Sequence, residues 1–226
     1  MLCSLFKSLK TLFCLLLFMA PCASIADSQI KIMLYGDSLM AGYGLTQDEN
    51  LASTIERKFA TDKMKAWLGK IGTLKIINSS VSGNTSNNGL ARIAWSLGDH
   101  PDIVVLCLGA NDMLRGIDPA LTKDNLNKMI VKIKENGAIV VLAGMQSPES
   151  MGENYQSQFD QLYVDLAKQH NTIFMPFLLE SVALKTQYLQ RDFKHPNALG
   201  IKVIANNLHP YLIKAIASLR ANKIKH

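Results

Sequence analysis

The sequence predicts an α/β protein in which a central five-stranded parallel sheet lies between two layers of helices, a three-layer α/β/α sandwich. The first observation is length, because 226 residues suffice for one α/β domain with a sizeable core but hardly for two. The second is that five short, nearly continuous apolar runs recur, as in strands covered on both faces of a parallel sheet. The third is that longer segments of helical periodicity separate these runs, which implies right-handed crossovers.

The expected strands, in chain order, cover residues 31–35, 74–78, 103–108, 138–143 and 172–175. A helix follows the first strand, because apolar residues recur there at helical spacing, at Leu51, Ile55 and Phe59. Two later segments repeat apolar residues at positions i, i+3, i+4 and i+7, and Gly137 ends the first of these helices. Their apolar residues are Leu126, Met129, Ile130 and Ile133, and then Phe159, Leu162, Tyr163 and Leu166.

A final helix is predicted to begin near Asn197, because asparagine is a favourable residue at a helix N-terminus. Leu199, Val203 and Ile204 are expected to face the core from this helix. Pro210 has no backbone N–H to donate, so we expect the helix to be bent or broken there.

Residues 1–26 have the layout of a secretory signal peptide. Lys7 and Lys10 form a basic start, and an almost wholly apolar stretch covers residues 12–20. Small residues at 24–26 offer a cleavage site. The apolar stretch is too short to span a bilayer easily, which favours a cleaved peptide over an uncleaved membrane anchor.

Cleavage would leave a single domain over residues 27–226, exported to the periplasm or secreted, with no stable membrane span. A lipoprotein attached at Cys22 is a less favoured alternative, because the residues before it suit that processing poorly. Of the four cysteines, only Cys107 would remain, so no internal disulfide is expected. Cys107 lies within an apolar run, where a buried structural thiol is expected and not a nucleophile.

The charge balance argues against nucleic acid as a main partner. The whole chain has 24 basic and 18 acidic residues, and the signal segment contributes two lysines and no acids. The remaining domain would carry 22 basic and 18 acidic residues, a net charge of +4. No run of basic residues is present either.

Polar loops follow the first three expected strands. They contain Gly36-Asp37-Ser38, then Ser82-Gly83 within residues 80–86, and then Asn111-Asp112. In open α/β sheets, ligands bind beyond the carboxyl ends of the strands, so these loops should converge on one edge. The backbone N–H groups of Ser38 and Gly83 and the side-chain amide of Asn111 are candidates to stabilise negative charge on a carbonyl oxygen.

An acid and a histidine near the end of the chain complete a set of groups for nucleophilic catalysis. Asp192 precedes His195 by three residues on one local turn. A histidine can remove the proton of a serine hydroxyl, and a carboxylate can fix the tautomer of that histidine. Ser38, His195 and Asp192 are therefore the candidate catalytic residues. Met40 stands two positions after Ser38, so the G-x-S-x-G elbow of α/β-hydrolases is absent.

Each of these residues also has a plainer interpretation. Gly36 and Gly83 can be turn glycines, Asn111 can belong to a turn or helix cap, Asp37 can support its loop, and His195 can be a surface histidine. Their joint occurrence in this order favours the catalytic interpretation. The other histidines show no metal-ligand spacing with acids, so no metal is expected; they are His100, His170, His209 and His226.

These residues resemble the four motif blocks of the SGNH, or GDSL, hydrolases. The blocks are Gly36-Asp37-Ser38-Leu39, Gly83, Asn111 and the pair Asp192 and His195. The resemblance spans essentially the whole chain after residue 26 and is strongest to the bacterial periplasmic thioesterase I, lysophospholipase L1 and arylesterase group. Segments 82–86, 89–92 and 114–116 agree with that group.

The resemblance implies a flavodoxin-like SGNH hydrolase fold with Ser38 as nucleophile, His195 as general base and acid, and Asp192 as its orienting group. Ser38, Gly83 and Asn111 would form the oxyanion hole. The chain departs from the family at Ala110, where relatives often have glycine. It also departs at Phe193 and Lys194, where glycine and an apolar residue are frequent. Both departures can reshape the acyl pocket.

The expected activity is that of a serine ester hydrolase that cleaves acyl esters and thioesters, including lysophospholipids, through an acyl-enzyme and without a cofactor. Residues 145–155, rich in Ser, Pro and Gly, are expected to form a mobile flap beside an apolar groove. One alternative is a carbohydrate acetyl-esterase of the same superfamily, which would need a shallow polar site. Others are a non-catalytic module that binds an anion at a helix start and a catalytically silent binding protein.

Overall fold

The computed structural model describes residues 29–69 and 73–224. The predicted signal peptide, residues 1–26, lies outside the described residues, so the division of the chain at residue 26 and its export stay predictions. No helix within the described part of the chain has the length and apolar character needed to cross a membrane.

Five parallel strands form one sheet, in the order β2-β1-β3-β4-β5. The predicted fold class and all five strands are confirmed, with each strand end within one residue of its expected position. The strands are β1 (Ile30–Gly36), β2 (Leu74–Asn78), β3 (Ile103–Cys107), β4 (Ile139–Ala143) and β5 (Ile173–Met175). Because β1 pairs with both β2 and β3, the strand order reverses there, and this is where open α/β sheets bind ligands.

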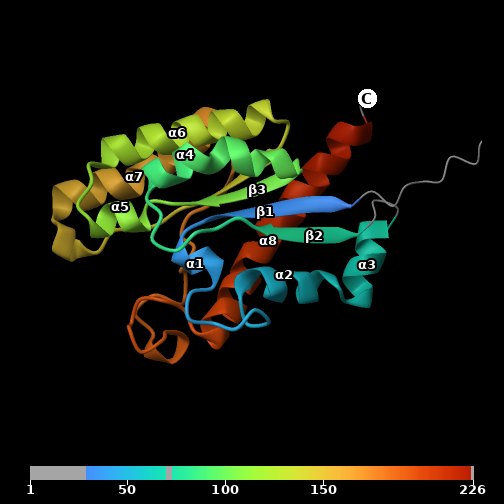
Figure 1. The fold of residues 1–226 in the computed structure, drawn as a ribbon, viewed down its shortest axis with the longest axis horizontal. Coiled ribbons are helices and arrows are strands. Elements are labelled where there is room, and N and C mark those ends of the chain that lie inside the picture. Colours follow the sequence, from blue (N-terminus) through green and yellow to red (C-terminus); the bar gives the residue numbers. More distant parts are fainter. Residues whose placement is uncertain (1–28, 70–72, 225–226) are drawn as a thin grey trace, which may run out of the picture.

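Helices cover both faces of the sheet (Figure 1). One face is covered by α2 (Leu51–Phe59) and α8 (Ala198–Ile224), with α3 (Asp62–Leu68) beside them. The other is covered by α4 (Ser86–Ser96), α6 (Pro119–Glu135) and α7 (Glu153–His170). Two short helices, α1 (Ser38–Ala41) and α5 (Ala110–Leu114), follow the carboxyl ends of β1 and β3.

The core lies between these layers and explains why the strands were visible as apolar runs. All five residues of β3 are buried, since helices pack on both of its faces. The eight apolar residues predicted to face the core from α6 and α7 are buried as well. Burying this apolar surface stabilises the fold by about 25 cal/mol per Å².

The last helix differs from its prediction in two ways. The side chain of Asn197 accepts hydrogen bonds from the N–H groups of Leu199 and Gly200, as expected of an N-cap. Leu199 is exposed, however, because Ile201 and Ile204 carry the buried face of this helix, and the prediction for Leu199 was wrong. The helix is also not broken at Pro210 but continues to residue 224. Burial of apolar residues on both sides of this proline offsets the lost hydrogen bond; they are Leu208, Leu212, Ala215 and Ile216.

Candidate active site

The polar loops after β1, β2 and β3 meet at one edge of the sheet, as predicted from their order. The backbone N–H of Val81 donates to the carbonyl of Gly36 at 3.0 Å, which joins the first two loops. The guanidinium of Arg92 donates to the carbonyls of Ser79 and Gly36, at 2.5 and 3.2 Å, and to the side chain of Asn84 at 2.8 Å. Arg92 therefore connects the end of β1 to the loop that follows β2, a role that no sequence pattern had indicated.

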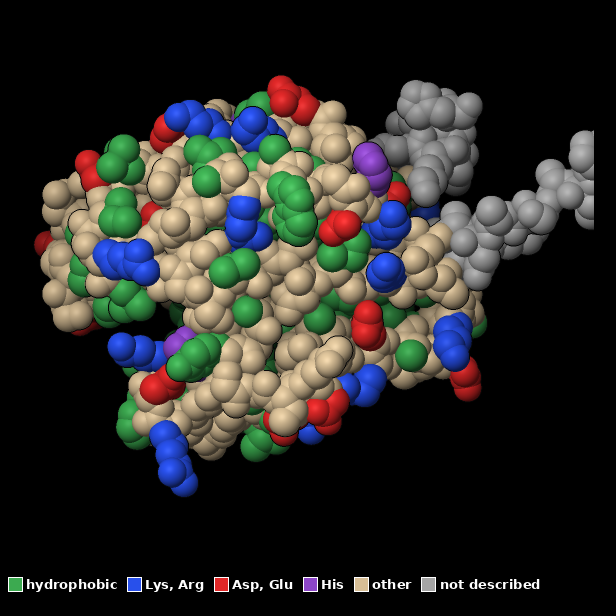
Figure 2. Space-filling model, viewed as in Figure 1, with side chains coloured by type: hydrophobic (Ala, Val, Ile, Leu, Met, Phe, Trp, Pro, Cys, Tyr) green, Lys and Arg blue, Asp and Glu red, His purple; other side chains and the backbone are tan. Residues whose placement is uncertain are grey.

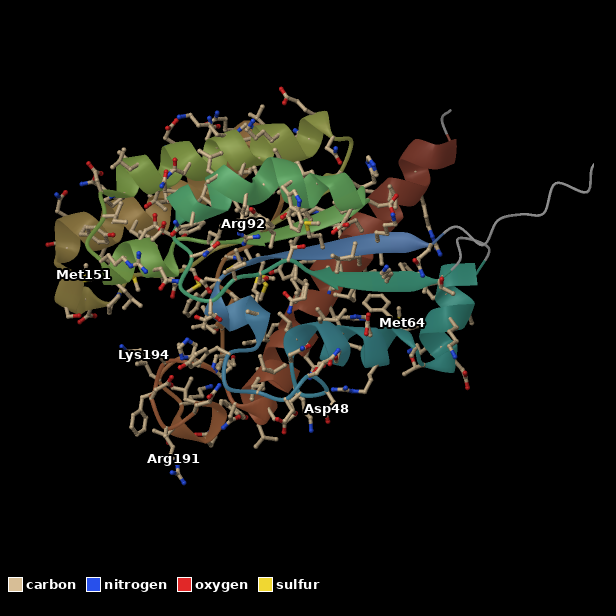
Figure 3. All side chains as sticks on the ribbon, viewed as in Figure 1. Asp48, Met64, Arg92, Met151, Arg191 and Lys194 are labelled. Carbon is tan, nitrogen blue, oxygen red and sulfur yellow. The ribbon has the colours of Figure 1, made fainter. Side chains whose placement is uncertain are left out.

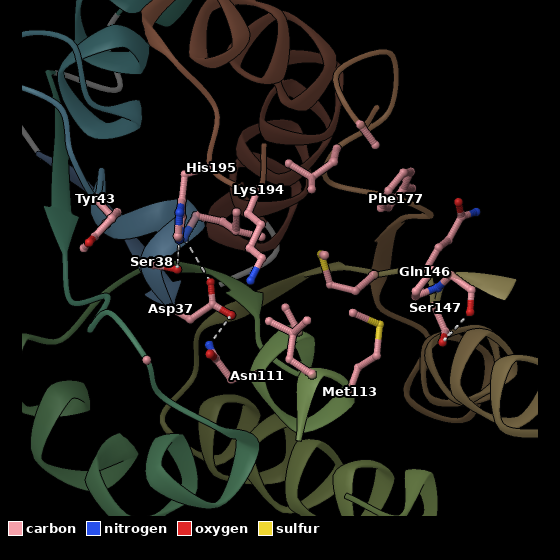
Figure 4. Close-up of a pocket in the computed structure, with 18 of the residues that line it drawn as sticks. Asp37, Ser38, Tyr43, Asn111, Met113, Gln146, Ser147, Phe177, Lys194 and His195 are labelled. Atoms are coloured by element: carbon pink, nitrogen blue, oxygen red, sulfur yellow. Dashed lines mark hydrogen bonds between the residues drawn. The ribbon is translucent and has the colours of Figure 1, made fainter. Parts of the chain in front are cut away.

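Ser38, His195 and Asp192 form a continuous chain of hydrogen bonds (Figure 4). The Oγ of Ser38 lies 2.8 Å from Nε2 of His195. Nδ1 of the same ring lies 2.6 Å from Oδ2 of Asp192. The structure thus brings together the three residues chosen from the sequence, although 157 positions separate Ser38 from His195.

The carboxylate of Asp192 is held in a fixed orientation by its second oxygen. Oδ1 accepts hydrogen bonds from the backbone N–H groups of Lys194 and His195, both at 3.0 Å. The hydrogen bond to the His195 ring, followed by those two backbone bonds, lowers the pKa of Asp192 far below its usual value. These contacts therefore favour the charged carboxylate of Asp192.

The loop that carries His195 is attached to the loop that carries Ser38. Gln190 donates its backbone N–H to the carbonyl of His195 at 2.8 Å and its side-chain amide to the carbonyl of Tyr43 at 2.7 Å. The ring of Tyr43 packs against the imidazole, with 4.6 Å between ring centroids. Gly44 has a φ of +72°, which disfavours any residue with a Cβ, and a Cβ there would also displace the side-chain amide of Gln190. Sequence reasoning missed Tyr43 and Gln190.

Ser38 is the first residue of α1, directly after β1. The side chain of Asp37 accepts the N–H of Leu39 at 3.0 Å and so begins this short helix. A Cβ at Gly36 would lie 2.7 Å from the carbonyl oxygen of Cys107 in β3, which explains the glycine by close packing of two strands.

Two of the three predicted oxyanion donors have no hydrogen-bond partner in the part of the chain that the structure describes. Among the described residues, none accepts a hydrogen bond from the backbone N–H of Ser38 or of Gly83. Gly83 has a φ of +80°, which disfavours any residue with a Cβ, and the space around its Cα is open. Both N–H groups are available to a bound molecule.

The third predicted donor, Asn111, is already engaged. Its side-chain Nδ2 donates to Oδ2 of Asp37 at 3.2 Å and to the carbonyl of Asn84 at 3.1 Å. Figure 4 shows this amide beside Asp37, close to Ser38. An amide nitrogen has two hydrogens, so Asn111 must release one contact to bind a ligand.

Asp37 is a buried carboxylate next to Ser38 in the chain, and it contacts the side-chain amide of Asn111. Burial raises its pKa to about 6, although the hydrogen bonds from Leu39 and Asn111 act in the opposite direction. This geometry agrees with the support role considered from the sequence. The neighbouring buried Asp112 accepts both the N–H and the hydroxyl of Ser86, at 2.7 and 2.5 Å, and so connects the third loop to α4.

An apolar pocket of about 540 Å³ opens beside Ser38 and His195. In Figure 4 it extends from these two residues toward Phe177 and Met113. Most of its wall is apolar and comes from several segments, including Leu39, Met113, Leu114, Met145, Pro148, Phe177, Leu179, Ala183 and Leu184. An apolar space of this size is typical of a site for a small organic ligand.

Residues 145–148 of the segment 145–155 line the pocket, and the mobility expected of this segment stays a prediction. Met145 and Ser147 are buried, and the N–H of Ser147 donates to Asp160 at 2.8 Å. The side-chain amide of Gln156 donates to the carbonyl of Ser147 at 2.9 Å. A short 3₁₀ turn at Glu149–Met151 leads directly into α7. These hydrogen bonds attach Ser147 to α7.

No group of three or more His, Cys, Asp or Glu side chains in the described part of the chain is arranged to hold a metal ion. Cys107 is buried in β3, and burial raises the pKa of its thiol well above the usual value. A thiol in that state is a poor nucleophile.

Comparison with known proteins agrees with this geometry. The sequence profile of the GDSL-like Lipase/Acylhydrolase family matches residues 34–203. An arylesterase of Vibrio mimicus is 37% identical over 208 residues, which cover 92% of this chain and 96% of the relative. Thioesterase 1/protease 1/lysophospholipase L1 of Escherichia coli strain K12 is 36% identical over 176 residues, covering 77% of this chain and 78% of the relative. The crystal structure of the psychrotrophic esterase EstA from Pseudoalteromonas sp. matches with a TM-score of 0.75 at 28% identity, over 83% of this chain and 98% of that chain.

Proposed function

This chain belongs to the GDSL-like lipase/acylhydrolase family, whose members include esterases, thioesterases and lysophospholipases, and we propose that it is a serine hydrolase of medium or long acyl esters and thioesters. The observation that carries the proposal is the hydrogen-bonded chain Ser38–His195–Asp192 at the mouth of an apolar pocket. The reaction needs no cofactor, because all proton transfers can be made by these side chains.

In the proposed mechanism, Ser38 Oγ attacks the carbonyl carbon of the substrate while Nε2 of His195 takes the hydroxyl proton. The tetrahedral intermediate then collapses, the bond to the alcohol or thiol breaks, and His195 returns the proton to that leaving group. Water, deprotonated by the same nitrogen, then attacks the acyl-serine ester. The second tetrahedral intermediate collapses, the bond to Ser38 Oγ breaks, His195 returns the proton to that oxygen, and the carboxylic acid leaves. Asp192 stabilises the imidazolium in each step through its 2.6 Å contact.

The negative charge on the carbonyl oxygen would be stabilised by the N–H groups of Ser38 and Gly83 and by the amide of Asn111. The two N–H groups have no acceptor among the described residues. Asp37 would act as a positioning residue. It holds the Asn111 amide beside Ser38. When the oxyanion forms, one N–H of that amide would leave Asp37 or the carbonyl of Asn84 and donate to the oxyanion instead.

We expect Asn111→Ala to lower kcat by roughly a hundred- to a thousand-fold, as loss of one oxyanion donor does in other hydrolases. KM should change far less, because the donor acts mainly on the transition state. The measurement is steady-state hydrolysis of a p-nitrophenyl ester, with thermal unfolding as the control. A variant that loses stability while each folded molecule keeps its turnover would show that Asn111 is only structural.

The acyl group is proposed to occupy the apolar pocket, whose dimensions and lining suit a hydrocarbon chain. The names arylesterase and thioesterase 1/protease 1/lysophospholipase L1, which two relatives carry, support esters and thioesters as the substrate class. A carbohydrate acetyl-esterase would need a polar, shallow site, which this apolar wall does not offer.

We expect octanoyl esters to be cleaved with higher kcat/KM than acetyl esters, by up to about fourfold for each methylene that becomes buried. The test is hydrolysis of p-nitrophenyl esters of graded chain length, with acyl-CoA and a lysophospholipid alongside. Phe177→Ser, at the end of the pocket away from Ser38 in Figure 4, should reduce the octanoyl rate and spare the acetyl rate. A wild-type preference for acetyl would overturn the lipid assignment and favour the carbohydrate acetyl-esterase.

A further inference from the structure

Exposed apolar side chains gather around the mouth of the pocket. Three residues that line it are also among the most exposed large apolar residues of the described chain: Leu184, Leu114 and Tyr43 have exposed fractions of 95%, 61% and 53%. Phe193, between Asp192 and His195, is 67% exposed. We call these four residues the rim. Figure 2 shows the molecule hollowed on its left side, where Figure 1 draws the orange loop below α5.

Two rim residues have a backbone conformation that suits them poorly. Leu184 and Phe193 have φ angles of +63° and +56°, in the left-handed region that residues with large side chains rarely adopt. Burial of their side chains does not compensate, because both point into solvent. The turn that holds Asp192 beside His195 explains the backbone at Phe193, but asparagine or glycine would make that turn more easily. The presence of large apolar side chains at these two positions is therefore explained neither by the backbone nor by burial, which points to a function for them.

Three cations accompany the rim in the same segment of the chain. Lys185 follows Leu184 directly, and Arg191 and Lys194 stand on either side of the Asp192–Phe193 pair. All three are exposed, and none forms an ion pair with a described side chain. Figure 3 shows Arg191 projecting from the lower side of the orange loop, whereas Lys194 lies at its upper edge, where it also lines the pocket. The acids of residues 180–194 are Glu180 and Asp192, and the latter is paired with His195.

We propose that the rim docks this protein onto an anionic lipid surface. Leu184 and Phe193 enter the apolar layer, while Lys185, Arg191 and Lys194 contact lipid phosphates, an arrangement typical of interfacial binding. Apolar side chains at loop tips, flanked by cations, suit a fluid lipid layer better than the flat, packed surface of a protein partner. This inference rests on the proposed function in one respect, since docking would place the pocket mouth where an acyl chain can enter it directly.

The test is flotation of the Ser38→Ala protein with lipid vesicles, so that no lipid is consumed during the measurement. Vesicles of equal parts phosphatidylcholine and phosphatidylglycerol should bind the protein, and pure phosphatidylcholine vesicles should bind it much more weakly. Leu184→Asn and Phe193→Asn should each weaken binding by about tenfold or more, as expected when a large apolar side chain no longer becomes buried. Asparagine adopts the left-handed conformation readily, so neither change should lower the melting temperature.

Two further variants test the cations, and a third is the control for an exposed apolar side chain outside the rim. Lys185→Gln and Arg191→Gln should each weaken binding by about fivefold. Neither residue lines the pocket, so hydrolysis of a soluble p-nitrophenyl ester should be unchanged in otherwise wild-type protein. Trp95→Gln removes a side chain that is 85% exposed near the end of α4, outside the rim, and should bind vesicles as before.

The proposal is overturned if anionic vesicles do not bind, if both asparagine variants bind like the parent protein, or if Trp95→Gln weakens binding as much as they do. These results are separable from the proposed function. A protein that hydrolyses soluble esters but does not bind vesicles contradicts only the docking. A protein that binds vesicles through the rim but hydrolyses no ester contradicts only the hydrolase.

Discussion

Ser38→Ala and His195→Ala are each expected to lower kcat/KM by about a million-fold, because catalytic residues that act as a unit lose most of the rate enhancement when one is removed. The 2.8 Å contact between Ser38 Oγ and His195 Nε2 is the physical basis. Without the hydroxyl no acyl-enzyme can form, and without the imidazole the hydroxyl stays protonated. Residual activity would come from the oxyanion donors and the pocket alone.

Two measurements check this expectation. Hydrolysis of a p-nitrophenyl ester gives the loss of rate, and labelling with a fluorophosphonate shows whether Ser38 is the nucleophile. Wild-type protein should be labelled and Ser38→Ala should not. Both should unfold at similar temperatures, since His195 is the only hydrogen-bond partner of Ser38 Oγ among the described residues. Activity of Ser38→Ala within tenfold of wild type would contradict the mechanism and leave a binding protein with this fold.

The fold was predictable because the central strands are buried on both faces. Strands such as β3 consist only of apolar residues, and runs of this kind are read directly from a sequence. The last helix was predicted less well, because a helix with a broad apolar surface does not show which residues face the sheet. Leu199 and Ile201 look equivalent in the sequence, and only packing against the sheet decides that Ile201 is buried.

The candidate site was predictable where its chemistry depends on residue type. Ser38, Asp192 and His195 could be chosen because few other residue types perform these roles, whereas the residues that position them could not. Gln190 acts through the carbonyl of Tyr43, 147 positions earlier, and any segment supplies a carbonyl. Contacts of this kind leave no pattern in a single sequence.

The segment over residues 145–155 shows the limit of composition as evidence. Its serines, proline and glycine indicated an irregular and mobile loop. The segment is irregular up to the 3₁₀ turn, and Asp160, about two turns into α7, accepts the N–H of Ser147. A hydrogen bond between a loop and the following helix is decided by the geometry of the fold, and not by the composition of the loop.

Asp192→Asn is expected to lower kcat/KM by about ten-thousand-fold, through the tautomer of His195 and not through loss of the turn. Oδ1 of Asp192 accepts two backbone N–H groups, so in the variant the amide oxygen must occupy that position. The amide NH₂ then faces Nδ1 of His195, which must become an acceptor. The ring proton moves to Nε2, and that nitrogen can no longer take the proton of Ser38.

A comparison of Asp192→Asn with Asp192→Ala separates this explanation from a structural one. The asparagine keeps both backbone hydrogen bonds, so its melting temperature should stay close to wild type, whereas alanine loses them and should unfold earlier. Fluorophosphonate labelling of Ser38 should slow in both variants, because labelling needs the same proton transfer to His195. If asparagine retained activity within tenfold of wild type, the Asp192 carboxylate would only support the turn, and Ser38 and His195 would have to act as a dyad.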